Sequence, residues 1–302
     1  MKAISLYLDE LRRRGGCTVA EHPAMRRLCT FRVGGTVAAA VFPEDADTLA
    51  FAVRRAAAAG IPLRVIGAGS NILPRDEAWE GVVLVTTKLK KLEKSQEYIL
   101  ADCGTPLNTL VLFCTKCGLA GTECLYGIPG TVGGAVYMNA GAHGTAMADV
   151  LTAAEVLDTE SGRTHRLSGD EFRFSYRHSL FQEERRLLLL RAAFLLPAGD
   201  GRALSETVRR VTRTRLESQP IAYPSAGSVF RRPPEGEVWR MVDRCGLRGF
   251  SVGGAQVSEK HAGFIINRGG ATAQDVRTVA ETVRARVRTV CGVSLSYEIE
   301  IW

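Results

Sequence analysis

The sequence predicts an α+β protein, because helical and strand patterns follow one another along the chain and glycine-rich loops lie between them. Apolar residues recur at helical spacing over residues 48–59, and compact apolar runs at 63–66 and 82–86 have the length of strands. Two more strand-like runs, 153–158 and 163–167, flank a short turn and indicate a hairpin. This mixture of helices, separate strands and a hairpin is typical of the α+β class.

The remaining elements follow from the same periodicities. Ile4, Tyr7, Leu8 and Leu11 form one helical stripe at the N-terminus, which Gly15-Gly16 ends. Residues 198–202 are expected to be a linker. The other expected helices are 106–117, 204–216, 238–245 and one after the capping signal Thr272-Ala-Gln-Asp275, and the other strands are 98–103, 187–196 and 264–267. The last helix is expected to bury an apolar stripe formed by Val276, Val279, Ala280, Val283, Val287 and Val290.

Two stretches alternate with a period of two. Residues 172–179 alternate aromatic with polar side chains, which predicts an extended segment with Ser175 and Arg177 on its polar face. Residues 293–301 alternate apolar residues with serine and glutamate, which predicts a strand. Pattern alone favours an exposed edge for Glu298 and Glu300, because carboxylates are normally solvated.

Composition is that of a globular protein of two, or three small, domains: 302 residues, 46% apolar and 24% charged. The net charge is +7, and lysine supplies seven of the 39 basic residues. Arginine therefore dominates, which suits bidentate recognition of phosphate or carboxylate. Basic runs are confined to 88–94 and 209–215, and runs of that size are usually solvated. No nucleic-acid partner is expected.

No apolar run reaches the roughly 18 residues that span a bilayer. The richest run, Leu187–Leu196, is interrupted by Arg191, and the N-terminus lacks the apolar core of a signal peptide. We therefore expect a cytoplasmic protein without membrane insertion, and a monomer.

Cysteine usage predicts no metal or redox site. Eight cysteines are dispersed, and the C-x-x-C at Cys114-Thr-Lys-Cys117 has no partner pair. Leu107, Leu110 and Val111 share a helical spacing with Cys114, so both thiols are expected on a helix as small core or partly exposed residues.

A glycine-dense stretch lies at 121–144, GTECLYGIPGTVGGAVYMNAGAHG. Glycine gives up more conformational entropy than other residues, so this density is costly unless the backbone needs positive φ angles or close approach. Backbone N–H groups freed in this way can form a nest around an anion. Ordinary turns are the alternative for this stretch alone.

A second glycine loop follows the strand-like run Leu63–Ile66 and reads Gly67-Ala68-Gly69-Ser70-Asn71. It departs from the dinucleotide fingerprint G-x-G-x-x-G, because Ile72 holds the third glycine position and Pro74 comes soon after. Two separate glycine loops with short polar side chains suit a diphosphate held by backbone N–H groups.

The two loops, Gly67–Asn71 and Tyr126–Ala135, resemble those of the MurB family of UDP-N-acetylenolpyruvoylglucosamine reductases, and further matches cover nearly the whole chain. The resemblance implies an FAD-binding, two-lobed flavin domain of the PCMH (vanillyl-alcohol-oxidase) type and a C-terminal α+β substrate domain. It implies a first lobe over 1–80, to which the strand 294–302 returns, a second lobe over 81–198, and a substrate-binding domain over 199–293. The FAD-contacting residues that it implies are Gly67, Ala68, Gly69, Ser70, Asn71, Ile72, Ile128, Pro129, Gly130, Thr131, Gly133, Gly134, Asn139 and Gly141.

Three motifs of the family carry its catalytic residues. Ser175–Ser179 resembles S-Y-R-x-S, which places the arginine at Arg177. Pro224–Phe230 contains a match to A-G-S-x-F, whose serine is the proton donor, and this implies Ser228. Leu295–Glu298 resembles L-E-P-E, whose second glutamate implies Glu298.

The resemblance implies that FAD takes hydride from NADPH and delivers it to C3 of the enolpyruvyl ether of a UDP-sugar. Charge then develops on C2 and its carboxylate, where Arg177 offers a charged fork. Ser228 hands a proton to C2, and Glu298 polarises that end or orients water and Arg177. The protein supplies orientation and electrostatics for the flavin's chemistry.

Further residues are implied for the substrate. Besides Arg177, Ser228 and Glu298, these are Arg231 and, within the family-like stretch 253–264, Lys260 and His261. The sequence also departs from the family pattern. In L-E-P-E, Ser296 replaces the first Glu and Tyr297 replaces the Pro. Arg231 and Arg232 stand where the family often has Lys-Asn, and Ser218 stands where lysine is common.

The chain resembles the shorter class of the family, because the interval between Arg177 and Pro197 leaves no room for the tyrosine-bearing loop of the longer class. The implied role is peptidoglycan precursor synthesis, and through it cell-wall biogenesis, cell shape and cell division.

Two alternatives stay open. One is an oxidase of the same flavin fold, with flavin attached through His143. The other is a non-enzymatic nucleotide- or RNA-binding protein that uses the basic helix 204–216. Bound flavin would be absent from the second, and its affinity would depend steeply on salt.

Overall fold

The computed structural model describes residues 2–302, and the chain divides into two compact units. Unit 1 comprises Met1–His22, Ala38–Ala68 and Glu80–Arg213. Unit 2 comprises Pro23–Val37, Gly69–Trp79 and Thr214–Trp302. Helix α6 (Gly201–Ser218) contains the last boundary, and another boundary lies at the Ala68–Gly69 peptide, inside the first glycine loop.

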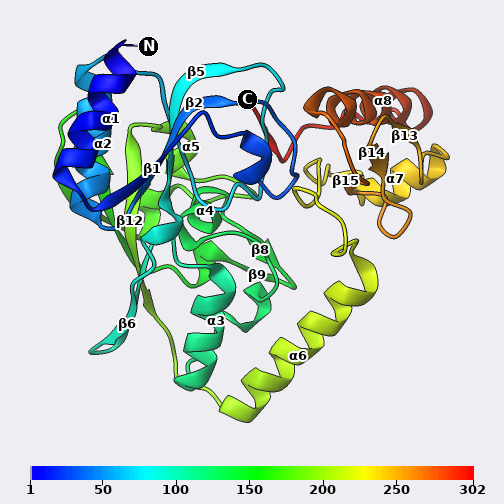
Figure 1. The fold of residues 1–302 in the computed structure, drawn as a ribbon. Helices are drawn as coiled ribbons and strands as arrows, with labels where there is room; N and C mark the ends of the chain where they lie inside the picture. The colour runs from blue at the N-terminus through cyan, green and yellow to red at the C-terminus, as the bar shows by residue number, and fades with distance from the viewer. Residues whose placement is uncertain (1) are drawn as a thin grey trace. The chain divides into compact units, whose positions relative to one another are not determined.

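Unit 1 contains a four-stranded sheet in the order β1-β2-β5-β3. The strand pairs at its two edges differ in direction: β1 runs antiparallel to β2, whereas β3 runs parallel to β5. The two helices α1 and α2 lie side by side next to it, α1 against β1 and α2 against β3 (Figure 1). The bounds are β1 Cys17–Glu21, β2 Val37–Pro43, β3 Leu63–Ile66, β5 Trp79–Val85, α1 Lys2–Arg14 and α2 Ala46–Ala58.

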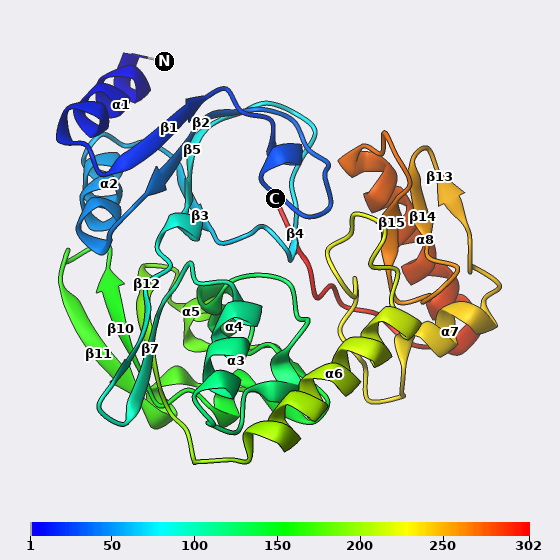
Figure 2. The same cartoon turned by 60° about the horizontal axis from the view of Figure 1, so that its bottom comes forward.

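A five-stranded sheet in the order β11-β10-β12-β7-β6 forms the rest of the framework of unit 1, and all its strands are antiparallel. Helices α3 and α4 contact one another, and α4 packs on β7 and β12 (Figure 2). The bounds are β6 Leu92–Ser95, β7 Tyr98–Asp102, β10 Ala153–Asp158, β11 Thr164–Ser168, β12 Leu187–Leu195, α3 Leu107–Lys116, α4 Val132–Tyr137 and α5 Leu180–Glu183, with a small hairpin of β8 Gly141–Ala142 and β9 Thr145–Ala146.

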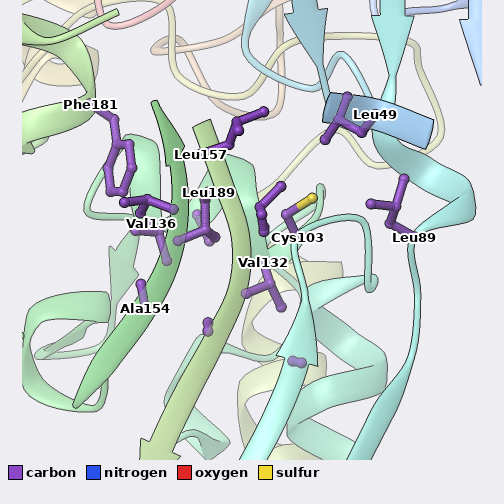
Figure 3. Packing of buried hydrophobic residues seen from close by; sticks show 14 of the residues in the cluster. Leu49, Leu89, Cys103, Val132, Val136, Ala154, Leu157, Phe181 and Leu189 are labelled. Atoms are coloured by element: carbon purple, nitrogen blue, oxygen red, sulfur yellow. The ribbon is translucent and has the colours of Figure 1, made fainter. Parts of the chain in front are cut away.

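One hydrophobic cluster fills unit 1. Leu189 on β12 and Ala154 and Leu157 on β10 face Val132 and Val136 of α4, and all five are at least nine-tenths buried (Figure 3). Because Val132 and Val136 are fully enclosed here, the core fixes α4 and with it the end of the second glycine loop.

Unit 2 is built on a three-stranded antiparallel sheet, β13-β14-β15, with α8 packed against all three strands and α7 beside α8 (Figure 2). A separate parallel pair joins β4 to β16 at the C-terminus. The bounds are β4 Ile72–Leu73, β13 Ser251–Val252, β14 Ala255–Val257, β15 Ile265–Asn267, β16 Glu300–Ile301, α7 Val238–Arg244 and α8 Ala273–Cys291.

Helix α8 begins where its sequence predicts. Thr272 and Asp275 form a capping box, with Thr272 Oγ1 accepting from the Asp275 N–H at 3.0 Å. Asp76 also accepts from the N–H groups of Ala273 and Gln274, each at 2.8 Å. The valines of its predicted stripe are buried through Val287, so α8 is held by its start and by one apolar face.

Most predicted elements are confirmed, and two extended segments are not. Residues 172–179 form no strand, because Arg173 and Arg177 take left-handed φ angles of 48° and 54°, which end any pleat. The 293–301 segment keeps the predicted burial of Val293, Leu295 and Ile299, but its paired strand is only β16. Residues 201–202, expected in a linker, are the first turn of α6. No helix in the described part of the chain is long and apolar enough to cross a membrane.

Candidate functional site

The second glycine loop lies in unit 1 between α3 and α4. Gly130 has φ 123°, its carbonyl accepts from the Leu107 N–H at 3.1 Å, and the Val132 N–H donates to the Thr105 carbonyl at 2.9 Å. Within residues 2–302, the N–H groups of Gly130 and Thr131 have no acceptor in the chain. Such N–H groups, at a backbone angle that favours glycine, can bind an anion.

The first loop begins against the second one. A Cβ on Gly67 would lie 2.2 Å from Thr131 Oγ1, so only glycine permits this approach. Thr131 in turn caps α4, since its Oγ1 accepts from the Gly134 N–H at 3.4 Å. Unit 1 therefore brings the start of one predicted FAD loop to the predicted FAD residues of the other, and this cradle of glycine backbone fits a diphosphate.

The rest of the first loop belongs to unit 2 and lies beside the C-terminal segment. Gly69 has φ 61°, and a Cβ there would lie 2.3 Å from the Leu28 carbonyl oxygen. Asn71 Nδ2 donates to the Glu298 carbonyl at 3.0 Å, and the Asn71 carbonyl accepts from the Glu300 N–H at 2.9 Å. Ile72 then pairs with Glu300 as β4 and β16.

Ser228 and Glu298 are carried by segments that are hydrogen-bonded to each other within unit 2. The Glu298 N–H donates to the Val229 carbonyl at 2.9 Å, and the Val229 N–H donates to the Gly263 carbonyl at 3.1 Å. Gly227, just before Ser228, has φ 76° and turns the chain there. Both Ser228 and Glu298 are half-buried, so the solvated-edge alternative for Glu298 fits less well than the sequence alone indicates.

Arg177 lies in unit 1, next to the end of the second glycine loop. Its Nη2 donates to the Gly141 carbonyl at 3.0 Å and its Nη1 to the Asn139 carbonyl at 3.5 Å. Asn139 is buried at φ 41°; its Nδ2 donates to the Ser175 carbonyl at 2.8 Å and its Oδ1 accepts from the Ala148 N–H at 2.9 Å. The side chain of Asn139 therefore joins the second glycine loop to the turn that carries Arg177, through hydrogen bonds to the protein backbone.

Three predicted substrate residues lie in unit 2. Lys260 Nζ donates to the Leu216 carbonyl at the end of α6. His261 packs edge-on against Phe264, and its Nδ1 accepts from the Gly263 N–H at 3.1 Å. Burial lowers the pKa of His261, so the neutral ring is favoured. Arg231 is half-buried and hydrogen-bonds through its N–H to the Ser296 carbonyl.

Two buried arginine nitrogens have no partner within residues 2–302: Nε of Arg231 and Nε of Arg215. Burial lowers the pKa of Arg215, the expected cost of a partly desolvated cation. An anion would satisfy such donors. Arg215 lies in the basic run 209–215, whose other arginines are exposed. Only its burial separates it from them, so the sequence pattern does not identify it.

Cys114 of the C-x-x-C motif is a buried thiol in α3. Burial raises the pKa of the Cys114 thiol to about 11, which leaves it protonated and unreactive near neutral pH. No cluster of metal-ligating side chains occurs among the described residues.

The predicted site residues thus fall into two groups. Unit 1 contains Gly67, Ala68, Ile128–Gly134, Asn139, Gly141 and Arg177. Unit 2 contains Gly69–Ile72, Ser228, Arg231, Lys260, His261 and Glu298. Each group is connected internally by the contacts above, and the individual roles stay predictions.

Comparison with known protein families first defines the class of protein to which this chain belongs. Residues 37–168 match the FAD binding domain family, and residues 219–302 match the C-terminal domain of UDP-N-acetylenolpyruvoylglucosamine reductase. The protein is therefore an FAD-dependent oxidoreductase with the expected PCMH-type flavin fold and a second, C-terminal domain.

Relatives over almost the full length then define the family. The chain is 40% identical over 290 residues to UDP-N-acetylenolpyruvoylglucosamine reductase of Thermotoga sp. (strain RQ2), which covers 96% of this chain and 95% of the relative. It is 41% identical over 279 residues to the reductase of Heliobacterium modesticaldum, which covers 92% of this chain and 88% of that one. The chain belongs to the UDP-N-acetylenolpyruvoylglucosamine reductase (MurB) family.

A solved structure agrees with this assignment. The crystal structure of UDP-N-acetylenolpyruvylglucosamine reductase from Thermus caldophilus matches with a TM-score of 0.82 and 33% identity, covering 95% of this chain and 99% of that one. A berberine bridge enzyme variant shares only the fold, at 15% identity and a TM-score of 0.51.

Proposed function

We propose that the protein reduces UDP-N-acetylenolpyruvoylglucosamine to UDP-N-acetylmuramate with NADPH. One observation carries the proposal beyond the family: the segments bearing Ser228 and Glu298, far apart in the sequence, are hydrogen-bonded neighbours, and Asn71 of the first FAD loop contacts the same Glu298 backbone. This supports the roles that we assign in unit 2 to Ser228 as proton donor, to Glu298 as carboxylate and to Asn71 in the cofactor loop.

FAD, when bound, would supply the hydride chemistry that links NADPH to the enolpyruvyl carbon C3. The backbone at Gly67, Gly130 and Thr131 would hold its diphosphate. Among the side chains, Arg177 balances the negative charge that develops on the substrate carboxylate, and preorganised charge of this kind is commonly worth about 10²–10³ in rate.

Ser228 delivers a proton from Oγ to C2 of the substrate. A serine hydroxyl is a weak acid, but C2 becomes strongly basic as hydride arrives at C3, so the transfer is downhill at that moment. Glu298 orients the reacting end of the substrate or the water near it. Hydride at C3 and a proton at C2 together convert the enolpyruvyl ether to a lactyl ether, and no other group leaves.

The UDP portion of the substrate is recognised by positive charge in unit 2. Arg231 and Arg215 each offer a buried Nε without a partner in the described chain, which suits a diphosphate. Lys260 adds a further positive charge, and the neutral ring of His261 offers an N–H donor. Arg231 stands where the family pattern has lysine, so a cation is kept at that position.

The cellular role that we propose is peptidoglycan precursor synthesis in the cytoplasm, and through it maintenance of cell shape and division. The support is the nucleotide sugar and NADPH themselves, which are cytoplasmic metabolites. A monomer suffices, because one chain supplies every predicted site residue.

The test is NADPH consumption by the purified, flavin-loaded protein with and without the enolpyruvyl UDP-sugar, followed by mass spectrometry of the product. We expect consumption to depend on the sugar, with one product molecule, heavier by two hydrogens, per NADPH. NADPH oxidation that is unaffected by the sugar and yields only reduced oxygen would reject the proposal and favour an oxidase.

A further inference from the structure

The extended segment that carries Glu298 is held from two sides. On one side it pairs with the Ser228 segment: Glu298 donates its N–H to Val229, Arg231 donates its N–H to Ser296 at 2.9 Å, and Phe230 bridges Tyr297. The rings of Phe230 and Tyr297 also stack, with centroids 5.3 Å apart and planes 30° apart.

On the other side the segment is tied to α8 by side chains. Tyr297 Oη donates to Glu281 Oε1 at 2.8 Å, and Glu281 accepts twice from Arg284 Nη1, at 3.0 and 2.9 Å. Arg284 Nε donates to the Leu295 carbonyl at 3.1 Å, and its guanidinium carbon lies 5.1 Å from the centre of the Tyr297 ring. Glu281, Arg284 and Tyr297 thus form a closed cluster, which we call the α8 tether.

The tether acts on backbone that lies outside any regular strand. Residues 293–299 belong to no regular strand, and β16 starts only at Glu300. Burial and the neighbouring Glu281 raise the pKa of Tyr297, so its hydroxyl remains a donor throughout the neutral range.

We propose that Tyr297 is a positioning residue for Glu298, and that the α8 tether fixes the backbone on which the Glu298 carboxylate and Ser228 meet the substrate. The proposal rests on the proposed function. The family motif has proline at this position, whose ring restricts φ without help from a neighbour. Tyrosine leaves φ free, so here the restriction comes from the hydrogen bond to Glu281 and the stack on Phe230.

The test is the variant Tyr297→Phe, which removes the hydrogen bond to Glu281 and keeps a ring to stack on Phe230. Anaerobic stopped-flow absorbance follows flavin reduction by NADPH separately from reoxidation by the enolpyruvyl UDP-sugar. We expect the limiting rate of reoxidation to fall about 10-fold or more, since small misplacements of a catalytic group are costly. Flavin content and the rate of reduction stay as in the parent. The matched control is Tyr223→Phe on the exposed Tyr223, which should change neither rate.

A second variant tests the partner. Glu281→Ala removes the bond from Tyr297 and also those from Arg284, so it should slow reoxidation at least as much. Combining it with Tyr297→Phe should add little, because the bond from Tyr297 is then already absent. Amide hydrogen exchange should quicken in the peptide 293–302 of each variant, a readout independent of turnover. Effects that multiply in the double variant, unchanged exchange, or equal slowing of both half-reactions would overturn the proposal.

Failure of the inference is distinguishable from failure of the proposed function. A parent enzyme that the enolpyruvyl UDP-sugar does not reoxidise rejects the function, and the positioning role with it. A parent that is reoxidised normally, beside Tyr297→Phe with the same limiting rate, rejects the positioning role alone.

Discussion

Single residues of this site are set by backbone geometry as much as by their side-chain chemistry. Arg177 takes a left-handed φ angle of 54° in the S-Y-R motif, and Asn139 takes one of 41° at the end of the second glycine loop. Such conformations cost about 1–3 kcal/mol each and persist where their surroundings hold them, often at functional sites. The hydrogen bonds from Arg177 to Gly141 and from Asn139 to Ser175 supply that hold.

Ser228→Ala removes the proposed proton donor without opening the core, since Ser228 is only half-buried. We expect the flavin content and the rate of reduction by NADPH to be retained. Reoxidation by the enolpyruvyl UDP-sugar should slow by about 10²–10⁴-fold, the usual contribution of proton donation. Ser228→Cys keeps a transferable proton and should recover part of the loss. Stopped-flow absorbance separates the two half-reactions, and slowing of the NADPH half-reaction alone would remove Ser228 from its proposed role.

His261 makes stability fall on acidification. Burial lowers the pKa of His261 in the folded protein below the value of about 6.5 in the unfolded chain. Below pH 6.5 the unfolded state therefore binds the additional proton, so this contribution to stability is present above that pH and is lost below it. Protonation also removes the Nδ1 acceptor of the Gly263 N–H.

Urea unfolding at several pH values tests this. The parent should lose stability between pH 6.5 and 5 with a contribution from His261 of at most about 1.4 kcal/mol per pH unit, and His261→Phe should show a shallower slope. An identical slope in the two proteins would place the titrating group elsewhere.

At the scale of elements, the glycine loops are fixed by the secondary structure on either side of them. The carbonyl of Gly130 is tied to the start of α3, and α4 begins at the Thr131 cap. Gly67 follows β3 directly and approaches Thr131 too closely for any side chain. The second loop and the start of the first are therefore held by the secondary structure of unit 1.

Gly130→Val should remove the flavin. A β-branched residue at φ 123° is strained by about 1–3 kcal/mol, and its side chain occupies space that we assign to the diphosphate. The control is Gly144→Val, whose φ is 84° and whose added Cβ meets no atom within 4 Å. We expect both variants to lose some thermal stability but only Gly130→Val to purify without flavin absorbance. Full flavin content in a folded Gly130→Val protein would show that the loop does not bind the cofactor.

Prediction from the sequence succeeded where the spacing of apolar residues reflects burial of one face of a helix or strand. The stripe of α8, its capping box and the strand at Leu63–Ile66 were all identifiable, because core burial and caps leave direct marks on the sequence. The period-two pattern at 172–179 misled, since Phe172 and Phe174 stack on each other at a turn instead of facing a sheet. Likewise, Arg215 and the α8 tether depend on tertiary contacts between distant segments, which no local pattern encodes.

At the scale of the whole molecule, the chain distributes its predicted site over two units whose sequences interleave. The first FAD loop crosses from unit 1 to unit 2 at the Ala68–Gly69 peptide, and the C-terminal segment returns to pair with β4 of unit 2. Unit 2 takes two short segments, Pro23–Val37 and Gly69–Trp79, from the first third of the sequence, and its largest segment, Thr214–Trp302, from the C-terminal part.

The central claim is that this protein passes reducing equivalents from NADPH to an enolpyruvyl UDP-sugar, and a single turnover tests it most directly. The flavin-loaded enzyme is reduced anaerobically with one equivalent of NADPH and then mixed with the sugar in a stopped-flow spectrophotometer. The account predicts full return of the oxidised flavin spectrum without oxygen and formation of one UDP-N-acetylmuramate per flavin. A flavin that stays reduced with the sugar and is reoxidised only when oxygen is admitted would contradict it.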